Sequence, residues 1–109
     1  KAAPYMTSYS ASKAALIHFT AVAAMEGAPY GVRVNTIVPG MIMTAATEDY
    51  LAKAGEHGQK TMDAIPMKRG ANPVEVAKAI AFMLSDEASY ITGVALPVDG
   101  GKAVQLYLP

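Results

Sequence analysis

The stretch VRVNTIVPG at residues 32–40 is the part of the chain that decides the fold class. The residues from Val32 to Val38 are rich in β-branched side chains, and Gly31 and Pro39-Gly40 bound them. A short apolar run between turn residues is typical of a strand that is buried on both faces. We therefore expect a strand of a parallel sheet over residues 32–38.

A helix pattern precedes this strand. Apolar residues cover most of the circumference of the predicted helix 9–27, so we expect it to be buried on more than one side. Thr7 or Ser8 is the expected N-cap, and Gly27, followed closely by Pro29, is the expected C-cap.

A polar insert, a second helix and a second strand follow the first strand. The insert 44–66 is rich in alanine, and Gly55 and Gly58 should interrupt any helix within it. Asn72-Pro73-Val74-Glu75 supplies an N-cap, a proline at the first helical position and an acidic residue at the third, which predicts a helix to about residue 85. After a turn at residues 92–93, residues 94–98 predict a strand that residues 99–101 close.

This alternation of helix and strand indicates an α/β fold with a parallel sheet. Two strands and two helices do not complete such a sheet, because an apolar parallel edge would lack a neighbour and invite aggregation. We therefore expect the C-terminal half of a larger domain, which is incomplete on its own. The absence of an initiator Met agrees with this expectation.

The composition excludes several classes of protein. Nine basic residues balance nine acidic ones, so nothing indicates a nucleic-acid partner, and the lack of cysteine rules out disulfides and thiolate metal sites. We expect no metal. No apolar run is long enough to span a membrane and no signal peptide pattern is present, so we expect a cytoplasmic protein without a membrane partner.

Tyr9 and Lys13 are the candidate chemical pair. Residues four apart share one face of a helix, so a phenol and an ammonium group can serve one site. A free tyrosine is a poor base at neutral pH, but a nearby cation and the positive end of a helix both favour the phenolate. By itself the spacing is common on solvated helix faces.

Four motifs in order resemble the short-chain dehydrogenase/reductase family, and the match runs from about residue 4 to residue 101. They are Tyr9-x-x-x-Lys13, the stretch 33–40, the Pro-Gly-x-Ile-x-Thr pattern that ends at Ile42 and Thr44, and residues 92–101. The resemblance implies the C-terminal part of one NAD(P)-binding, doubly wound, Rossmann-like domain over residues 1–109.

The resemblance also implies roles for these residues. Tyr9 would exchange a proton with the oxygen of an alcohol or ketone substrate, while hydride passes to or from NAD or NADP. Lys13 would hydrogen-bond the nicotinamide ribose and favour the phenolate of Tyr9. The Pro39-Gly40 turn, the Ile42 backbone and the Thr44 hydroxyl would hold the nicotinamide carboxamide.

Other polar residues have plainer interpretations. Asn35 should be a structural hydrogen-bonding residue, Thr44 could also cap a helix of the insert, and Asp99 should close the final turn. His18 is expected in a core or an interface, and His57 is expected to be exposed.

The family's Gly-rich loop and catalytic Ser would precede Lys1, so we expect this chain alone to lack turnover and to need an N-terminal half. Residues 44–66 correspond to the substrate loop, where Met41, Met43, Met62 and Met67 could form an apolar wall or simply fill space. The resemblance further implies a homodimer or homotetramer, and the apolar tail 102–109 could dock on a subunit.

Two other interpretations stay open. The chain could be a non-catalytic half-domain that folds or oligomerises only with a separate N-terminal half. It could also be an extended-type epimerase or dehydratase, although it ends soon after residues 99–101. The enoyl-reductase branch is expected to have a wider Tyr–Lys spacing than this chain has.

Overall fold

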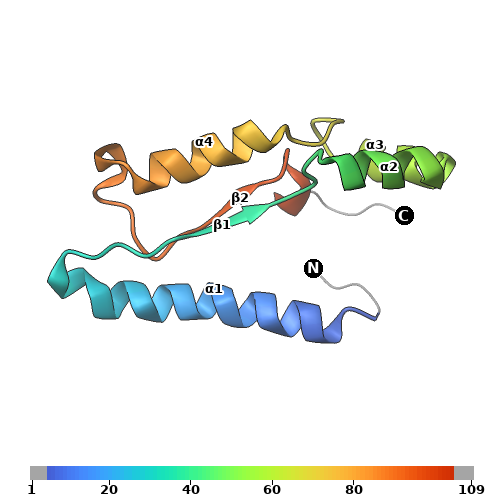
Figure 1. Ribbon diagram of the computed structural model, residues 1–109. Helices are drawn as coiled ribbons and strands as arrows, with labels where there is room; N and C mark the ends of the chain where they lie inside the picture. Colours follow the sequence, from blue (N-terminus) through green and yellow to red (C-terminus); the bar gives the residue numbers. More distant parts are fainter. Residues whose placement is uncertain (1–4, 105–109) are drawn as a thin grey trace. The chain divides into compact units, whose positions relative to one another are not determined.

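A computed structural model describes residues 5–104, and Figure 1 traces the order of its elements. The helices are α1 (Thr7–Gly27), α2 (Ala45–Ala54), α3 (Glu56–Asp63) and α4 (Pro73–Leu84); the strands are β1 (Thr36–Pro39) and β2 (Ala95–Val98); and short 3₁₀ turns occupy Ala28–Tyr30, Asp86–Ala88 and Lys102–Val104. The predicted docking of the tail at residues 105–109 lies outside the described residues.

These residues form two compact units. One unit combines the chain up to Ile37 with Phe82–Leu96, and the other combines Val38–Ala81 with the chain from Pro97 onward. Each unit is described by itself below.

The two strands pair in a parallel sheet, as predicted. The Thr36 N–H donates to the carbonyl of Val94 at 2.8 Å, and the Gly40 N–H donates to the carbonyl of Val98 at 2.9 Å. Donor and acceptor both advance by four residues along the chain, which is the register of parallel strands. The chain is therefore an α/β fragment with two neighbouring strands of such a sheet.

Helix α1 confirms the predicted helix, but both predicted caps are wrong. The N-cap is Met6, which makes no side-chain capping bond, and Thr7 and Ser8 lie inside the helix. At the other end the chain continues through a 3₁₀ turn that contains Pro29, and Gly31 at φ +73° ends it in the left-handed region. Gly27 instead allows Val32 to approach the end of α1, since a Cβ at position 27 would lie 3.1 Å from the Val32 carbonyl oxygen.

The predicted burial of α1 on more than one side is wrong for this chain. Thr20 and Ala24 are buried, whereas Phe19 is 64% exposed and Met25 is 79% exposed. The Thr20 hydroxyl donates to the carbonyl of Leu16 at 2.9 Å and also bonds the Thr36 hydroxyl. Only the face of α1 that carries Thr20 and Ala24 is therefore buried, because a two-stranded sheet can cover only one face of a helix. His18 is exposed as well, so it does not lie in a core; its place in an interface stays a prediction.

Strand β1 is shorter than predicted, and residues 32–35 run alongside residues 91–94 instead. The Arg33 guanidinium donates to the carbonyls of Met83 at 2.9 Å, Ser85 at 3.3 Å and Ile91 at 3.1 Å. Gly93 turns the partner segment at φ +76°, so a regular ladder starts only beyond it. Thr36, Ile37 and Val38 are half-buried and Pro39 is exposed, so the predicted burial of the strand on both faces is wrong for this chain.

Asn35 is a structural hydrogen-bonding residue, as predicted. Its amide nitrogen donates to the carbonyl of Ile91 at 3.1 Å, and its amide oxygen accepts from the Val94 N–H at 3.0 Å. The side chain therefore takes the place of a ladder bond at the entrance to the sheet.

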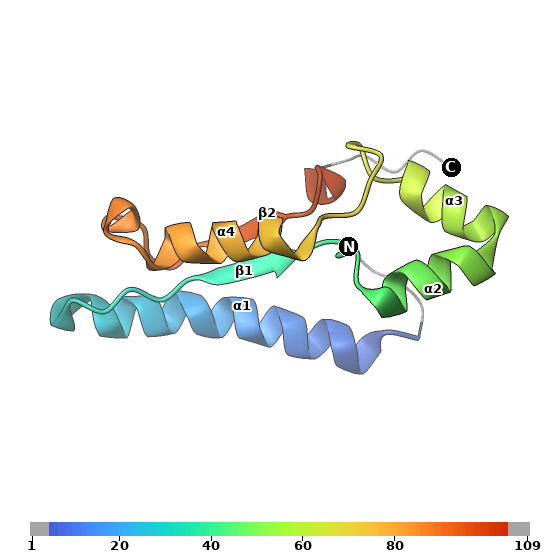
Figure 2. The ribbon, with the colours of Figure 1, turned by 45° about the horizontal axis from the view of Figure 1, so that its top comes forward.

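The insert contains two helices, α2 and α3, which contact each other and meet at an angle at the turn between them (Figure 2). Gly55 separates them at φ +57°, as predicted, but Gly58 lies inside α3 and does not interrupt it. A Cβ at Gly58 would lie 2.7 Å from the Leu51 carbonyl oxygen, so this glycine lets the two helices approach closely. His57 is exposed, as predicted. Within residues 5–104, none of the helices combines the length and the apolar character that a bilayer span needs.

Replacing Asn35 by Ala should destabilise the intact protein by about 1–3 kcal/mol, because the Val94 N–H and the Ile91 carbonyl each lose a partner. Urea denaturation of both proteins measures the difference. Lys53→Ala is the control, since its ion pair with Asp49 is exposed and should be worth less than about 1 kcal/mol. Equal effects of the two substitutions would contradict the structural role of Asn35.

Candidate functional site

Tyr9 and Lys13 lie on one face of α1, as their spacing predicts. The Lys13 ammonium nitrogen is 5.4 Å from the centroid of the Tyr9 ring. Both side chains are exposed, and the tyrosine is 56% exposed. A phenol that is accessible and has a cation beside it can give up or accept a proton at its oxygen.

The helix itself adds to this electrostatic environment. Tyr9 is the third residue of α1, where backbone N–H groups lack partners within the helix. The first turn contains no acidic residue to offset the positive end of the helix dipole. The helix end and the Lys13 ammonium group therefore both contribute positive potential near the first two turns of α1.

Pro39 and Gly40 lie where β1 ends, and both are exposed. A Cβ on Gly40 would lie 2.8 Å from both the Cα and the Cβ of Asp99, so only glycine allows this approach. Asp99 closes its turn as predicted, since its carboxylate accepts from the N–H groups of Gly101 at 3.0 Å and Ala103 at 2.8 Å. Glycine at position 40 thus sets the close approach of the two strand ends.

Ile42 lies in a parallel bridge with Ala71. The Ala71 N–H donates to the carbonyl of Met41 at 2.8 Å, and the Met43 N–H donates to the Ala71 carbonyl at 2.8 Å. In a trans peptide the carbonyl and the following N–H point in opposite directions. The Ile42 N–H therefore points away from Ala71, which leaves it directed at the opposite side of the segment.

Thr44 caps α2, as predicted. Its hydroxyl oxygen accepts from the Thr47 N–H at 3.3 Å and lies 3.1 Å from the Thr47 hydroxyl. The side chain is exposed. A capping oxygen has a second lone pair, so capping leaves Thr44 able to accept a hydrogen bond from a ligand.

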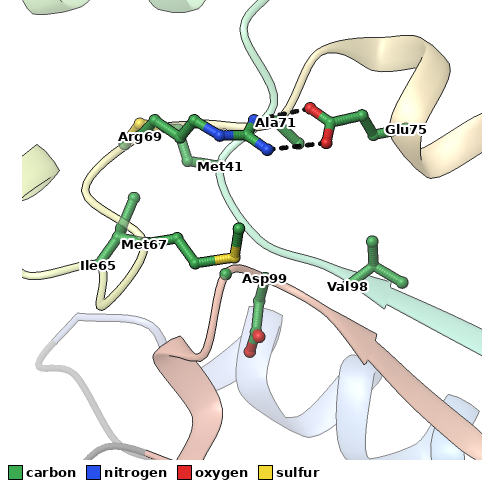
Figure 3. A pocket seen from close by; sticks show the side chains of 9 residues that line it. Met41, Ile65, Met67, Arg69, Ala71, Glu75, Val98 and Asp99 are labelled. Atoms are coloured by element: carbon green, nitrogen blue, oxygen red, sulfur yellow. Dashed lines mark hydrogen bonds and ion pairs between the residues drawn. The ribbon is translucent and has the colours of Figure 1, made fainter.

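A pocket of about 120 Å³ lies beside this segment, and Figure 3 shows its side chains. Met41 and Met67 line it together with Arg69, Glu75 and Asp99. A second pocket of about 380 Å³ has Gly40 and Met41 in its wall. Of the four methionines singled out from the sequence, Met41 and Met67 thus line a pocket, whereas Met43 packs against Gly70.

Arg69 and Glu75 form a two-pronged ion pair at one side of that pocket (Figure 3). The two nitrogen–oxygen distances are 2.7 and 2.9 Å, and Glu75 also accepts from the Asn72 N–H at 2.9 Å. The hydrogen bonds from Arg69 and then from Asn72 lower the pKa of the Glu75 carboxyl to about 2. Asn72 caps α4 in return, accepting from the Val74 N–H at 3.1 Å, so the predicted helix start is confirmed.

The sequence-predicted site residues fall into two groups. Tyr9 and Lys13 belong to the unit of α1, and Pro39, Gly40, Ile42 and Thr44 belong largely to the segment after β1 in the other unit. Sequence reasoning missed Ala71, which bonds this segment from the chain before α4, and Arg69, which lines the pocket beside it. The only signal was the predicted start of the helix at Asn72, which does not identify what precedes it.

Comparison with known proteins assigns the family. A family model described as enoyl-(acyl carrier protein) reductase matches residues 1–103. The acetoacetyl-CoA reductase of Allochromatium vinosum is 50% identical over 93 residues, which are 85% of this chain and 37% of that protein. The chain belongs to the short-chain dehydrogenase/reductase family, as its motifs indicated.

Solved structures agree with this assignment. A short-chain dehydrogenase family protein from Francisella tularensis superposes with a TM-score of 0.82 at 34% identity, covering 95% of this chain and 46% of that one. A putative 2-deoxy-d-gluconate 3-dehydrogenase from Agrobacterium tumefaciens with bound NADP gives 0.80 at 35% identity, covering 90% and 39%. The chain thus spans less than half the length of the proteins named here, and it matches Rossmann-like structures over that part.

Replacing Gly40 by Ala should destabilise the intact protein by about 1–3 kcal/mol, because the new Cβ would displace the backbone of Asp99. Thermal unfolding measures the loss. Gly55→Ala is a suitable comparison: position 55, unlike position 40, has a positive φ, but it has nothing within 4 Å of a built Cβ, so backbone strain alone should cost about 1 kcal/mol. A Gly40→Ala protein as stable as the parent would contradict the close approach.

The stability that Glu75 contributes should depend on pH. Its pKa is lowered in the folded protein from 4.5 to about 2, so the contribution is complete above about pH 4.5 and is lost as the pH falls toward 2. Urea midpoints of the parent protein and Glu75→Gln, compared at pH 7, 4.5 and 3, should converge with decreasing pH. A constant difference over that range would show that the carboxylate charge does not stabilise the fold.

Proposed function

We propose that this chain is part of an NAD(P)-dependent oxidoreductase that interconverts an alcohol and a ketone, with Tyr9 as the proton-transferring group. The observation that carries the proposal is the juxtaposition of the exposed Tyr9 phenol and the Lys13 ammonium group at the positive end of α1. Family membership supports an oxidoreductase, since the named relatives are a reductase and a dehydrogenase.

The residues present fit the nicotinamide end of a dinucleotide. The Ile42 N–H points away from its bridge partner and can donate to a carboxamide oxygen, while the Thr44 oxygen can accept from a carboxamide nitrogen. Both groups follow the carboxyl end of a parallel strand, which is where open α/β sheets bind ligands. We infer that Pro39, Gly40, Ile42 and Thr44 hold this end of the cofactor.

A bound nicotinamide cofactor supplies or accepts the hydride. In the direction of reduction the Tyr9 hydroxyl gives its proton to the substrate oxygen as the carbonyl carbon gains the hydride, so an alcohol forms. Lys13 stabilises the phenolate that remains and can donate a hydrogen bond to the ribose. In the direction of oxidation Tyr9 takes the proton back, which makes it acid and base in turn.

We favour a carbonyl over an enoyl substrate because Tyr9 and Lys13 are four residues apart, and because the relative from Allochromatium vinosum is named for a ketone reduction. The substrate-loop role of residues 44–66, the homodimer or homotetramer and the cytoplasmic location remain predictions from the sequence.

The two other interpretations differ from this proposal in what the intact protein does. A non-catalytic half-domain would show no hydride transfer in complex with its partner. An extended-type epimerase or dehydratase would consume a sugar nucleotide without net oxidation of the cofactor. The named relatives are a reductase and a dehydrogenase, which favours the oxidoreductase over both other interpretations.

Tyr9→Phe should lower the rate of hydride transfer by the intact protein by about 100-fold or more, because the substrate oxygen loses its proton donor. Acetoacetyl-CoA with NADH or NADPH, followed at 340 nm, is a first assay. Tyr90→Phe removes a phenol hydroxyl from an exposed position of the same unit and should leave the rate unchanged. Survival of hydride transfer in Tyr9→Phe within about threefold, less than 1 kcal/mol in the barrier, would disprove the role of Tyr9.

A further inference from the structure

Residues 39–44 form the segment that the proposed function assigns to nicotinamide binding. Pro39, Gly40 and Thr44 are exposed, and the segment lies between the end of β1 and the start of α2. A group that must present an N–H to a ligand needs its backbone held at the correct angle. The contacts that fix the backbone of residues 39–44 should therefore affect how tightly the segment binds a ligand.

Ala71 provides two of the contacts that fix the backbone of this segment. Its N–H and its carbonyl bond Met41 and Met43 on either side of Ile42, both at 2.8 Å. Since these two bonds determine which way the intervening peptide faces, Ala71 sets the direction of the Ile42 N–H. Gly70 leaves room beside these bonds, because a Cβ there would lie 3.3 Å from the Met41 carbonyl oxygen and 2.6 Å from the flexible Met43 side chain at its sulfur.

Ala71 is in turn placed by its neighbours on both sides. Arg69 precedes it by two residues, and its guanidinium bonds both carboxylate oxygens of Glu75 and the carbonyl of Gly70 at 3.2 Å. Glu75 accepts from the N–H of Asn72, the residue after Ala71. The carboxylate thus ties the chain before and after Ala71 to the first turn of α4.

We propose that Glu75 and Arg69 are positioning residues for the nicotinamide-binding segment, acting through the bridge between Ala71 and Ile42. This inference rests on the proposed function and adds to it a pair that does not touch the cofactor. An exposed ion pair is worth little by itself. This one differs from the Asp49–Lys53 pair because it has two-pronged geometry and bonds the backbone of the residue next to the bridge.

The test compares two ligands that differ by the nicotinamide alone. Dissociation constants of the intact protein are measured for NADH or NADPH by fluorescence, and for ADP-ribose, or its 2′-phosphate, by calorimetry. In Glu75→Gln the constant for the dinucleotide should rise about fivefold, within the range that such indirect couplings reach. The constant for ADP-ribose should change less than twofold, because that ligand makes no use of the Ile42 N–H.

Two further variants complete the test. Arg69→Lys keeps the charge but not the two-pronged geometry, so its effect should have the same selectivity and a smaller size; it also serves if Glu75→Gln does not fold. Asp49→Asn is the matched control on α2 and should leave both constants unchanged. The amide of Met43 should exchange with deuterium faster in Glu75→Gln than in the parent protein.

The possible results are distinct. Selective loss of dinucleotide affinity supports the positioning role. Equal weakening of both ligands, or no change in either, overturns it while leaving the proposed function intact. Failure of the parent protein to bind NADH and NADPH at all would overturn the proposed function and this inference together.

Discussion

The contact between Gly40 and Asp99 is the constraint on which the second unit depends. The ends of β1 and β2 approach so closely there that a Cβ at position 40 would lie 2.8 Å from Asp99. Asp99 uses its carboxylate to close the turn that follows, and Gly100 then accepts the N–H of Met67 through its carbonyl at 3.1 Å. Met67, which lines the pocket, is therefore hydrogen-bonded to the turn that follows β2, next to the strand end that Gly40 contacts.

A different kind of contact organises the first unit. There the side chains of Arg33 and Asn35 bond backbone carbonyls in the last turn of α4 and in the loop after it, and Thr20 and Thr36 join α1 to the start of β1. Few large side chains are buried in either unit; among the described residues the buried apolar ones are Ala24, Ile65, Val76, Met83 and Ala88.

The sequence predicted the elements better than their surroundings. The alternation of periodicities predicted α1, α4, both strands and their parallel pairing, because local patterns carry that information, whereas α3 runs through Gly58, where an interruption was expected. The burial of α1 was not predictable from its own apolar residues, since burial depends on what else is available to cover Phe19 and Met25. The pair Tyr9–Lys13 could be found from its spacing, but the bridge from Ala71 to Ile42 could not. Backbone atoms make this contact between residues 29 positions apart, so the pattern of side chains along the sequence does not indicate it.

That bridge has a consequence for how such a site can change over time. The hold on residues 41–43 consists of backbone hydrogen bonds, which do not depend on the side chains at positions 41 and 43. Substitutions of Met41, which lines both described pockets near this segment, can therefore reshape the pocket walls without altering those two bonds. Side chains line the pockets while backbone hydrogen bonds hold the segment, so the specificity of the site can change without a change in the backbone.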